Sequence, residues 1–520
     1  MEGRTTTTCM PKDPGVVVWR RRLATRVPGY PPLRSSAGSR ARAAGPVAPS
    51  RPGRGMLNPM ACDDRPHEKS SGALTPPDEH DRRVGQAFLA ASAIGAVRTL
   101  NAWRPVSRTG RTSVLAFPGG LTVSEMPLHS LAWQALATAG FVAAGSLRSR
   151  AGRAGLALTA ASWVGLVGLD RTAARADEVL EAALVEGLGP DYRSRMAAAF
   201  APPEDVVITR REVANPLPPL RRRYATTRDV PYGEFGRRNH LDIWRRSDLA
   251  DDAGAPVLIQ VHGGAWMTGS KEQQGAPLMG HLAERGWVSV ALNYRLSPRS
   301  TWPDQIVDVK RAIAWVKEHI AEYGGDPEFV VITGGSAGGH LSALAALTPG
   351  VAAFQPGFEN VDTSVQAAVP MYGVYDFTNR DRTGRADMED MLSRLVFKSR
   401  LADAGEVWEQ ASPMSWVGPD APPFFIAHGA NDSLVPVEQA RSFARMLKEA
   451  SDQPVVYAEL PHAQHAFDLF SSVRTIHTLR AIDRFLAVVR TAHDSRVVDG
   501  TPADAVDVAD AVEPSAPSAS

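Results

Sequence analysis

Cysteine is almost absent from this sequence. Only two occur among 520 residues, Cys9 and Cys62, so no position after 62 can form a disulfide, ligate a metal through a thiolate or act as a cysteine nucleophile. The chain also lacks the His-Glu-x-x-His spacing, or any similar spacing, of a zinc enzyme. These absences argue against a metal enzyme, although a protein without disulfides can still be exported.

Excess charge is absent as well. The 57 basic residues nearly balance the 56 acidic ones, which leaves a net charge of +1 and indicates neither a nucleic-acid partner nor an acidic one. Residues 1–85 contain few large apolar side chains and are predicted to be a disordered tail. Their only apolar run, residues 16–19, is too short for the core of a signal peptide. Residues 494–520 are predicted to be a second disordered tail.

Long uncharged runs occur in one region, residues 86–200, which we expect to be helical. Residues 128–147 and 154–169 contain no charged side chain, and a spanning helix needs about 20 apolar residues, with roughly 17 as the lower limit. Their small residues would allow two helices to pack closely in lipid. The favoured interpretation is a membrane hairpin and a membrane-associated protein. The alternative is a pair of buried helices that caps a soluble, cytoplasmic protein. Arginines flank both runs, so the sidedness is not indicated.

After a proline- and arginine-rich linker at residues 201–223, short apolar strands alternate with helices through residues 224–493. Near-continuous apolar strands with helical crossovers predict a mostly parallel sheet covered on both faces, in the α/β class. Residues 373–415 interrupt this alternation with charged, weakly periodic sequence, and we expect a lid there. The expected strands are residues 241–244, 256–261, 287–294, 329–333, 367–372, 423–428 and 455–460.

The fourth of these strands leads into a glycine-rich turn that contains Ser336. The turn reads Gly334-Gly335-Ser336-Ala337-Gly338-Gly339, and an alanine-rich, helix-favouring segment follows it. A strand, a tight turn and a helix around Gly-x-Ser-x-Gly predict a nucleophile elbow, in which small neighbours prevent the strand and the helix from colliding. Ser336 is therefore the candidate nucleophile, in a strained backbone conformation. The alternative is a plain glycine-rich turn.

A serine nucleophile needs a base, and the base needs an acid that holds its tautomer. Asp432 follows the expected strand at 423–428, and His465 follows the strand at 455–460. Because the carboxyl ends of parallel strands meet at one edge of a sheet, both side chains are expected beside the elbow. The sequence thus predicts Ser336, Asp432 and His465 as a catalytic triad, with His462 as the second candidate for the base.

Acyl transfer also needs N–H donors for the oxyanion, each typically worth about 3 kcal/mol of barrier. One is the N–H of Ala337, directly after the nucleophile. The others are expected in His262-Gly263-Gly264-Ala265-Trp266, directly after the strand at 256–261, because glycine lets the backbone turn its N–H groups inward. Gly263, Gly264 and Ala337 are therefore the candidate oxyanion hole.

Together these motifs resemble the α/β-hydrolase superfamily. The most similar members are the bacterial carboxylesterases related to hormone-sensitive lipase, type-B esterases and arylformamidases. The resemblance rests on His262-Gly263-Gly264-Ala265-Trp266, Tyr294-Arg295-Leu296-Ser297-Pro298, the Ser336 elbow, His428-Gly429 with Asp432, and His465-Ala466-Phe467. The N-terminal hairpin resembles that of actinobacterial membrane-associated esterases. Two positions differ from the hormone-sensitive-lipase branch, which usually has a third glycine at Ala265 and an aspartate at Gly335.

The resemblance implies a serine carboxylic-ester hydrolase that needs no cofactor. Its substrates would be small-molecule or lipid-like esters with short or medium acyl chains. An amide hydrolase of the arylformamidase type and a catalytically silent binding protein on the same fold are the alternatives. Trp266 and Trp302 are candidates for the acyl pocket, although core packing accounts for them equally well, and Arg295 is expected in a structural ion pair. No pattern indicates an oligomeric state.

Overall fold

The computed structural model describes residues 78–108, 110–203 and 208–498, so most of both predicted tails lies outside the described residues. Two corrections fall inside them. Helix α1 (Glu79–Trp103) covers the last residues of the tail predicted at 1–85, because the Asp78 carboxylate caps the helix by accepting the Asp81 N–H at 2.7 Å. Helix α14 (Val473–Val498) likewise continues past residue 494.

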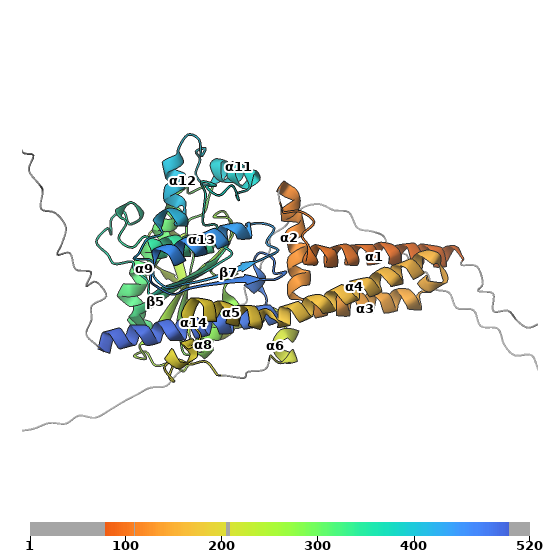
Figure 1. Cartoon of the computed structure of the whole chain (residues 1–520), viewed down its shortest axis with the longest axis horizontal. Helices are drawn as coiled ribbons and strands as arrows, with labels where there is room; N and C mark the ends of the chain where they lie inside the picture. Colours follow the sequence, from red (N-terminus) through yellow and green to blue (C-terminus); the bar gives the residue numbers. More distant parts are fainter. Residues whose placement is uncertain (1–77, 109, 204–207, 499–520) are drawn as a thin grey trace, which may run out of the picture. The chain divides into compact units, whose positions relative to one another are not determined.

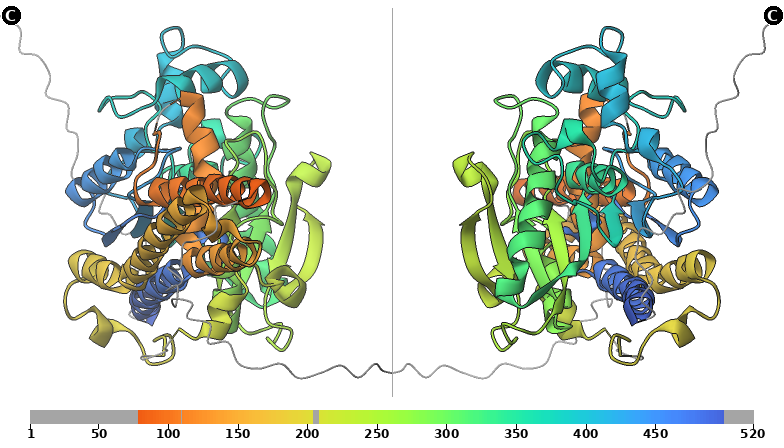
Figure 2. Two further views of the ribbon diagram at one scale, coloured as in Figure 1. Left: turned by 90° about the vertical axis from the view of Figure 1, so that its right-hand side faces the viewer. Right: turned by 90° about the vertical axis from the view of Figure 1, so that its left-hand side faces the viewer.

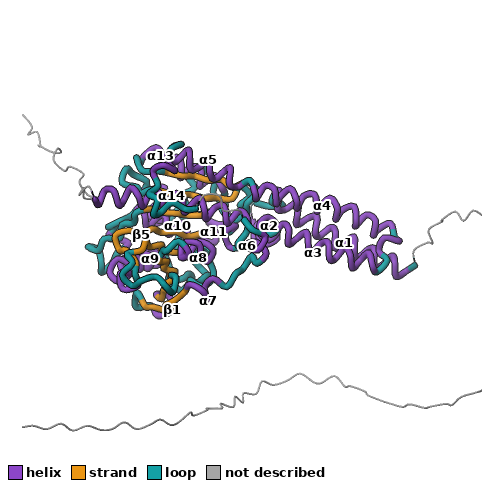
Figure 3. The backbone as a smooth tube through the Cα atoms, turned by 90° about the horizontal axis from the view of Figure 1, so that it is seen from below, coloured by secondary structure: helices purple, strands orange, loops and turns teal. Residues whose placement is uncertain are grey.

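The described chain contains an eight-stranded sheet, which lies in the left-hand part of Figures 1 and 3, and helices α1, α3 (Pro127–Ala143) and α4 (Arg150–Ala174) extend away from it. Its order is β1-β2-β4-β3-β5-β6-β7-β8, with β1 and β2 antiparallel to their neighbours and all later pairs parallel. The mostly parallel sheet was predicted; the edge strand β1 was not. The strands are β1 (Ala225–Pro231), β2 (His240–Trp244), β3 (Ala255–Val261), β4 (Val288–Leu292), β5 (Gly325–Gly335), β6 (Ala367–Met371), β7 (Phe424–Gly429) and β8 (Val455–Leu460).

Helices cover both faces of this sheet (Figure 2). In β3, the side chains of Ile259 and Val261 enter one hydrophobic core with α9, α10 and α13, whereas Leu258 enters a second core with α5, α8 and α14. This alternation is what a strand buried on both faces requires. The helices are α5 (Ala176–Leu188), α8 (Ala276–Glu284), α9 (Asp304–His319), α10 (Ala337–Leu347) and α13 (Val437–Ala450).

The N-terminal region is helical, as predicted. It contains α1, α2 (Gly110–Glu125), α3 (Pro127–Ala143) and α4 (Arg150–Ala174), and α1, α3 and α4 lie side by side. Helices α3 and α4 occupy the two uncharged runs. Among the described helices, the continuous stretch Arg150–Leu188 is long and apolar enough to cross a membrane, by length and composition alone. The last helix of the region ends at Leu188, because Gly189 adopts φ 92° and breaks it.

The segments expected as a linker and as a lid both contain short helices. The linker carries α6 (Arg210–Ala214) and α7 (Leu220–Tyr224). The insertion after β6 carries α11 (Ala386–Leu395) and α12 (Gly405–Ala411), and α11 contacts α2. The insertion is partly built into the core, since Trp408 of α12 is fully buried.

Candidate active site

Ser336 lies in the tight turn between β5 and α10, where the elbow was expected. Its φ of 60° and ψ of −121° fall outside the regions that residues with a side chain favour, which is the strain typical of a nucleophile elbow. The flanking glycines are needed for space: a Cβ on Gly334 would come within 2.6 Å of the Val261 carbonyl oxygen, and one on Gly339 within 2.6 Å of that of Met371. The Ser336 N–H donates to the latter oxygen at 3.0 Å.

Asp432 and His465 form a buried pair in the loops that follow β7 and β8. The Asp432 Oδ2 lies 2.7 Å from His465 Nδ1, and its Oδ1 accepts the N–H groups of Leu434 and Val435, each at 2.8 Å. The His428 Nε2 lies 3.2 Å from Oδ2. Burial alone would raise the pKa of Asp432, but the charge of His465 and the hydrogen bonds from His428 and His465 outweigh burial and hold that pKa below its usual range. The carboxylate is therefore ionised and fixed.

The serine hydroxyl is free in this structure. It makes no hydrogen bond to any residue that the structure describes, and Ser336 itself is half-buried. Tyr372 directly follows Met371, whose carbonyl oxygen accepts the Ser336 N–H. The ring of Tyr372 lies 4.8 Å from the ring of His465. His462, the second candidate base, faces α1 instead, with its Nδ1 3.1 Å from the Trp103 carbonyl oxygen.

The loop after β3 lies against the nucleophile. A Cβ on Gly263 would come within 2.6 Å of the Gly335 carbonyl oxygen and 3.2 Å of the Ser336 Cβ, so only glycine fits there. Gly264 adopts φ 120°, a conformation that also requires glycine. No hydrogen bond within the described residues uses the N–H of Gly264 or Ala337. The Gly263 N–H, by contrast, donates to Gln274 Oε1 at 2.7 Å.

His262 holds this loop in place rather than taking part as an acid or base. Its Nδ1 lies 2.8 Å from the Gly263 oxygen, its ring stacks on Tyr294 at 4.2 Å, and the Tyr294 hydroxyl donates to the His262 carbonyl oxygen at 2.9 Å. Burial lowers the pKa of His262 to about 4, so the ring is neutral at neutral pH.

The two tryptophans proposed from sequence are buried in the core. The Trp266 Nε1–H donates to His340 Nδ1 at 3.0 Å, and Trp302 packs 5.7 Å from the same ring. Burial lowers the pKa of His340 to about 3. These contacts favour packing over substrate binding. Arg295 forms the expected ion pair, with Asp308 at 2.8 Å.

Sequence reasoning missed Tyr372 and Asp468. The Tyr372 hydroxyl donates to the Asp468 carboxylate, and the same hydroxyl occupies the space that a Cβ on Gly335 would need. The structure thus explains why glycine stands at 335: the tyrosine fills the volume in which another side chain would lie. One signal could have indicated Tyr372. It directly follows β6, at the edge of the sheet that carries the other site residues.

Comparisons with known proteins point to one class of enzyme. A family model described as BD-FAE matches residues 241–447. The chain is 53% identical over 411 residues to the probable carboxylic ester hydrolase LipM of Mycobacterium tuberculosis, which covers 78% of this chain and 94% of LipM. Esterase LipQ of the same organism is 51% identical over 330 residues, covering 63% of this chain and 78% of LipQ. Among solved structures, esterase Est2 of Thermogutta terrifontis is 25% identical, covers 57% of this chain and 100% of that one, and has a TM-score of 0.42.

Proposed function

We propose a mechanism from one premise: this chain belongs to the bacterial carboxylesterases of the hormone-sensitive-lipase type, within the α/β-hydrolase superfamily. Its activity is the hydrolysis of carboxylic esters. The observation that carries the mechanism is the 2.7 Å contact between Asp432 and His465, at the same sheet edge as the strained Ser336.

In the proposed reaction, the Ser336 hydroxyl attacks the ester carbonyl carbon while His465 Nε2 accepts its proton. Asp432 keeps the other proton of the ring on Nδ1, so Nε2 is the basic atom. His465 then gives the proton to the leaving alcohol. A water molecule, deprotonated by the same nitrogen, attacks the acyl-enzyme and releases the acid. No step requires a cofactor.

The N–H groups of Gly264 and Ala337 are the proposed donors to the oxyanion, since neither has a partner among the described residues. The Gly263 N–H becomes a third donor when Gln274 releases it. The Gln274 side-chain oxygen, which now accepts the Gly263 N–H, lies where the oxyanion of the substrate would be stabilised. A carbonyl oxygen of the substrate would therefore exchange with Gln274 rather than enter an empty space.

Acyl esters of short or medium chain length are the proposed substrates. The named relatives are ester hydrolases, which favours an ester over the amide of an arylformamidase. The insertion at 373–415 is the proposed lid. Its Arg385 donates to the carbonyl oxygens of Ser433, at 2.7 Å, and Leu434, at 3.1 Å, so the insertion is attached to the loop that carries Asp432.

A series of p-nitrophenyl esters of increasing acyl length, measured on the wild type and on Ser336→Ala, tests the mechanism. We expect the variant to lose at least about 10³-fold in kcat/KM on every ester. Ser342→Ala, which removes a buried hydroxyl from α10, is the matched control and should retain activity. Equal rates for the wild type and Ser336→Ala would overturn the mechanism. An N-formyl aromatic amine measured in parallel gives the ratio of ester to amide cleavage.

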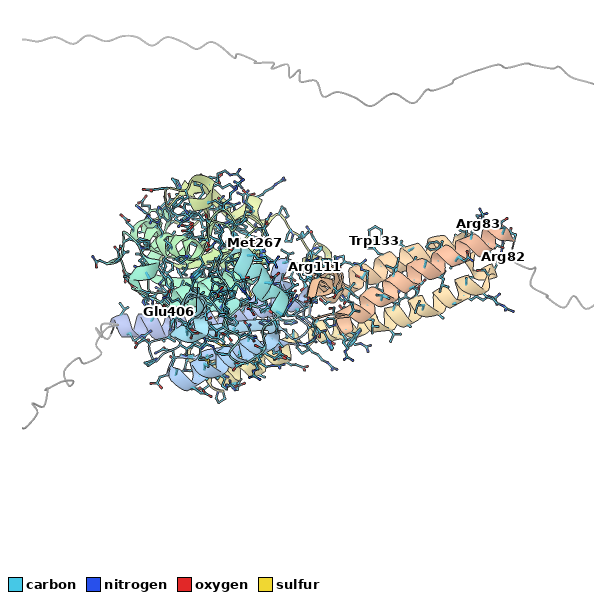
Figure 4. The ribbon with its side chains drawn as sticks, turned by 90° about the horizontal axis from the view of Figure 1, so that it is seen from above. Arg82, Arg83, Arg111, Trp133, Met267 and Glu406 are labelled. Atoms are coloured by element: carbon cyan, nitrogen blue, oxygen red, sulfur yellow. The ribbon has the colours of Figure 1, made fainter. Side chains whose placement is uncertain are left out.

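The second part of the proposal is that α1, α3 and α4 are embedded in a lipid bilayer. Large apolar side chains point outward from these helices: Ile94 is 64% exposed, Trp133 75% and Val164 75%. Figure 4 shows Trp133 directed away from the bundle, and Arg82 and Arg83 at the end of α1 that is remote from the sheet. An outward face of this kind is costly in water and favourable in lipid.

Part of the interior of the same bundle is polar, beside buried apolar side chains such as Phe88 and Leu166. Thr99 and Ser162 share a hydrogen bond of 2.8 Å between α1 and α4, and Thr159 donates to Ser92 at 2.9 Å one turn away. All four are buried. Small and hydroxyl side chains inside with large apolar ones outside is the arrangement by which helices associate in membranes. It supports lipid as the medium around the bundle.

Cell fractionation tests this placement. We expect the full-length protein in the membrane fraction, resistant to extraction at high salt and released by detergent. Replacing Val97, Trp133 and Val164 together with glutamate should move it to the soluble fraction. The matched control replaces Leu217, Val361 and Val497, which are also exposed but lie outside the bundle. Wild-type protein that is soluble without detergent would contradict the proposal.

A further inference from the structure

The N-terminal helices contact both loops that carry the proposed acid and base. The Asn431 amide, next to Asp432, donates to the carbonyl oxygens of Ala102 at 2.9 Å and Trp103 at 3.0 Å, which end α1. On the second loop, the ring of His462 packs 4.6 Å from that of Trp103. The site is therefore not built from the residues after 224 alone.

Both ends of helix α2 are held by residues that come after the linker: the start by the insertion that follows β6, and the end by α14. At its start, Arg385 Nη2 donates to the Gly110 carbonyl oxygen at 3.2 Å. At its end, Glu125 forms a fully buried ion pair with Arg474 of α14 and accepts the Ser472 hydroxyl at 2.8 Å. A helix held at both ends keeps the residues between them in fixed positions relative to the loops.

One of those residues, Phe117, packs against the proposed catalytic base. Its ring centroid lies 5.9 Å from that of His465, with the planes at 74°. Tyr372 contacts the same imidazole edge-on at 4.8 Å and 62°. Phe117 is only half-buried, so it is available to a bound substrate as well as to His465.

The chemistry of ester cleavage says which part of a substrate lies there. His465 must give its proton to the oxygen of the leaving alcohol, so the alcohol group lies beside this imidazole when the tetrahedral intermediate breaks down. The acyl group, attached to the carbon that Ser336 attacks, lies on the other side of that carbon. A side chain packed on His465 therefore meets the alcohol before it meets the acyl chain.

We propose that α2 forms the wall of the alcohol-binding side of the site, and that Phe117 is the specificity-determining residue that limits the size of the alcohol. The proposal rests on the proposed function, because it takes His465 as the proton donor. Removing the ring opens space next to His465 without touching Ser336, Asp432 or the oxyanion loop. Leu115, on the same helix, is 80% exposed and so points into solvent, unlike the half-buried Phe117.

Two substrate series distinguish a limit on the size of the alcohol from a general disturbance of the active site. In the first, butanoyl esters share the acyl group and differ in the alcohol, from methyl to phenyl to 1-naphthyl. In the second, p-nitrophenyl esters share the alcohol and differ in acyl length. For Phe117→Ala we expect the kcat/KM ratio of naphthyl to methyl ester to rise by about 10-fold, with the acyl-length profile unchanged. Phe117→Trp should lower the same ratio.

Leu115→Ala is the matched control and should leave both series as in the wild type. Phe117→Leu keeps an apolar side chain of intermediate size and should give an intermediate ratio, which guards against misfolding of the alanine variant. An unchanged alcohol ratio in Phe117→Ala, or a change in acyl-length profile instead, overturns the proposal. Failure of the underlying mechanism would look different, because Ser336→Ala would then remain active.

Discussion

Two buried carboxylates, those of Asp432 and Asp468, lie close to His465, and they have different hydrogen-bond partners. Asp432 accepts from His465 Nδ1. Asp468 instead accepts from the Tyr372 hydroxyl, and burial raises its pKa above the usual value. Sequence position favoured Asp432, because it follows a strand, and it gave no role to Asp468, three residues after the histidine. What the sequence could not show is the hydrogen-bond partner of each carboxylate, since Asp468 is held by Tyr372 and Asp432 by His465 and two backbone N–H groups.

Replacing each carboxylate with its amide distinguishes these roles. Asp432→Asn should lower kcat by on the order of 10³- to 10⁴-fold, because the amide no longer holds the tautomer in which Nε2 is basic. Asp468→Asn should lower kcat by no more than about 10-fold, since the amide oxygen can still accept from Tyr372. Steady-state kinetics on p-nitrophenyl butanoate would measure both. Equal losses would show that the acid is misassigned.

Within the region that was expected to be helical, α2 is a helix to which no particular sequence pattern pointed. Its residues include Gly119, Gly120 and an internal proline, Pro118, all of which disfavour a helix. Contacts with partners hundreds of positions away, such as the Glu125–Arg474 ion pair, hold it in place. Such contacts leave no periodic signal in a sequence. The apolar strands and the elbow, by contrast, were predictable because their pattern is local.

Removing one charge of this buried pair should destabilise the protein more than removing both. Glu125→Ala leaves Arg474 charged and buried without its partner, which typically costs about 3–5 kcal/mol of the free energy of unfolding. The double variant Glu125→Leu with Arg474→Met should recover most of that loss, since two apolar side chains can fill the space. Denaturant unfolding in detergent would measure both. A double variant no more stable than the single one would contradict the expectation.

At the scale of the whole molecule, the order Ser336, Asp432, His465 and the sheet that brings these residues to one edge could be predicted from sequence. The participation of the N-terminal region could not. The proline-rich segment at 201–223 indicated a separate unit, yet α5 packs on the sheet through Leu180 and Leu184, in the same core as strand residues. An amphipathic helix shows that one face is buried, and not against which partner.

Stability should fall as the pH falls below about 6.5. Burial lowers the pKa of His262 to about 4 and of His340 to about 3, from an ordinary value of 6.5. Between these values the unfolded chain binds protons that the folded chain does not. Each histidine therefore removes up to about 1.4 kcal/mol of unfolding free energy per pH unit in that window.

The free energy of unfolding at pH 7, 6 and 5 would measure this dependence. His340→Gln should reduce the pH slope, because glutamine can still accept from Trp266 and donate to Ala411 but does not titrate in this range. His319→Gln is the control, since 36% of the His319 side chain is exposed to solvent, in contrast to the buried His340. An undiminished slope in His340→Gln would place the acid sensitivity elsewhere.

Helix α5 packs closely against β8, which limits the positions at which the protein could be truncated or recombined with a related esterase. Gly187 lies so near β8 that an added Cβ would be 2.6 Å from the Val455 carbonyl oxygen. A shortened protein starting at Tyr224 would uncover that strand and leave the amide of Asn431 without its acceptors. Recombination between esterases at the proline-rich segment should therefore yield inactive hybrids, whereas exchanges upstream of α1 should be tolerated.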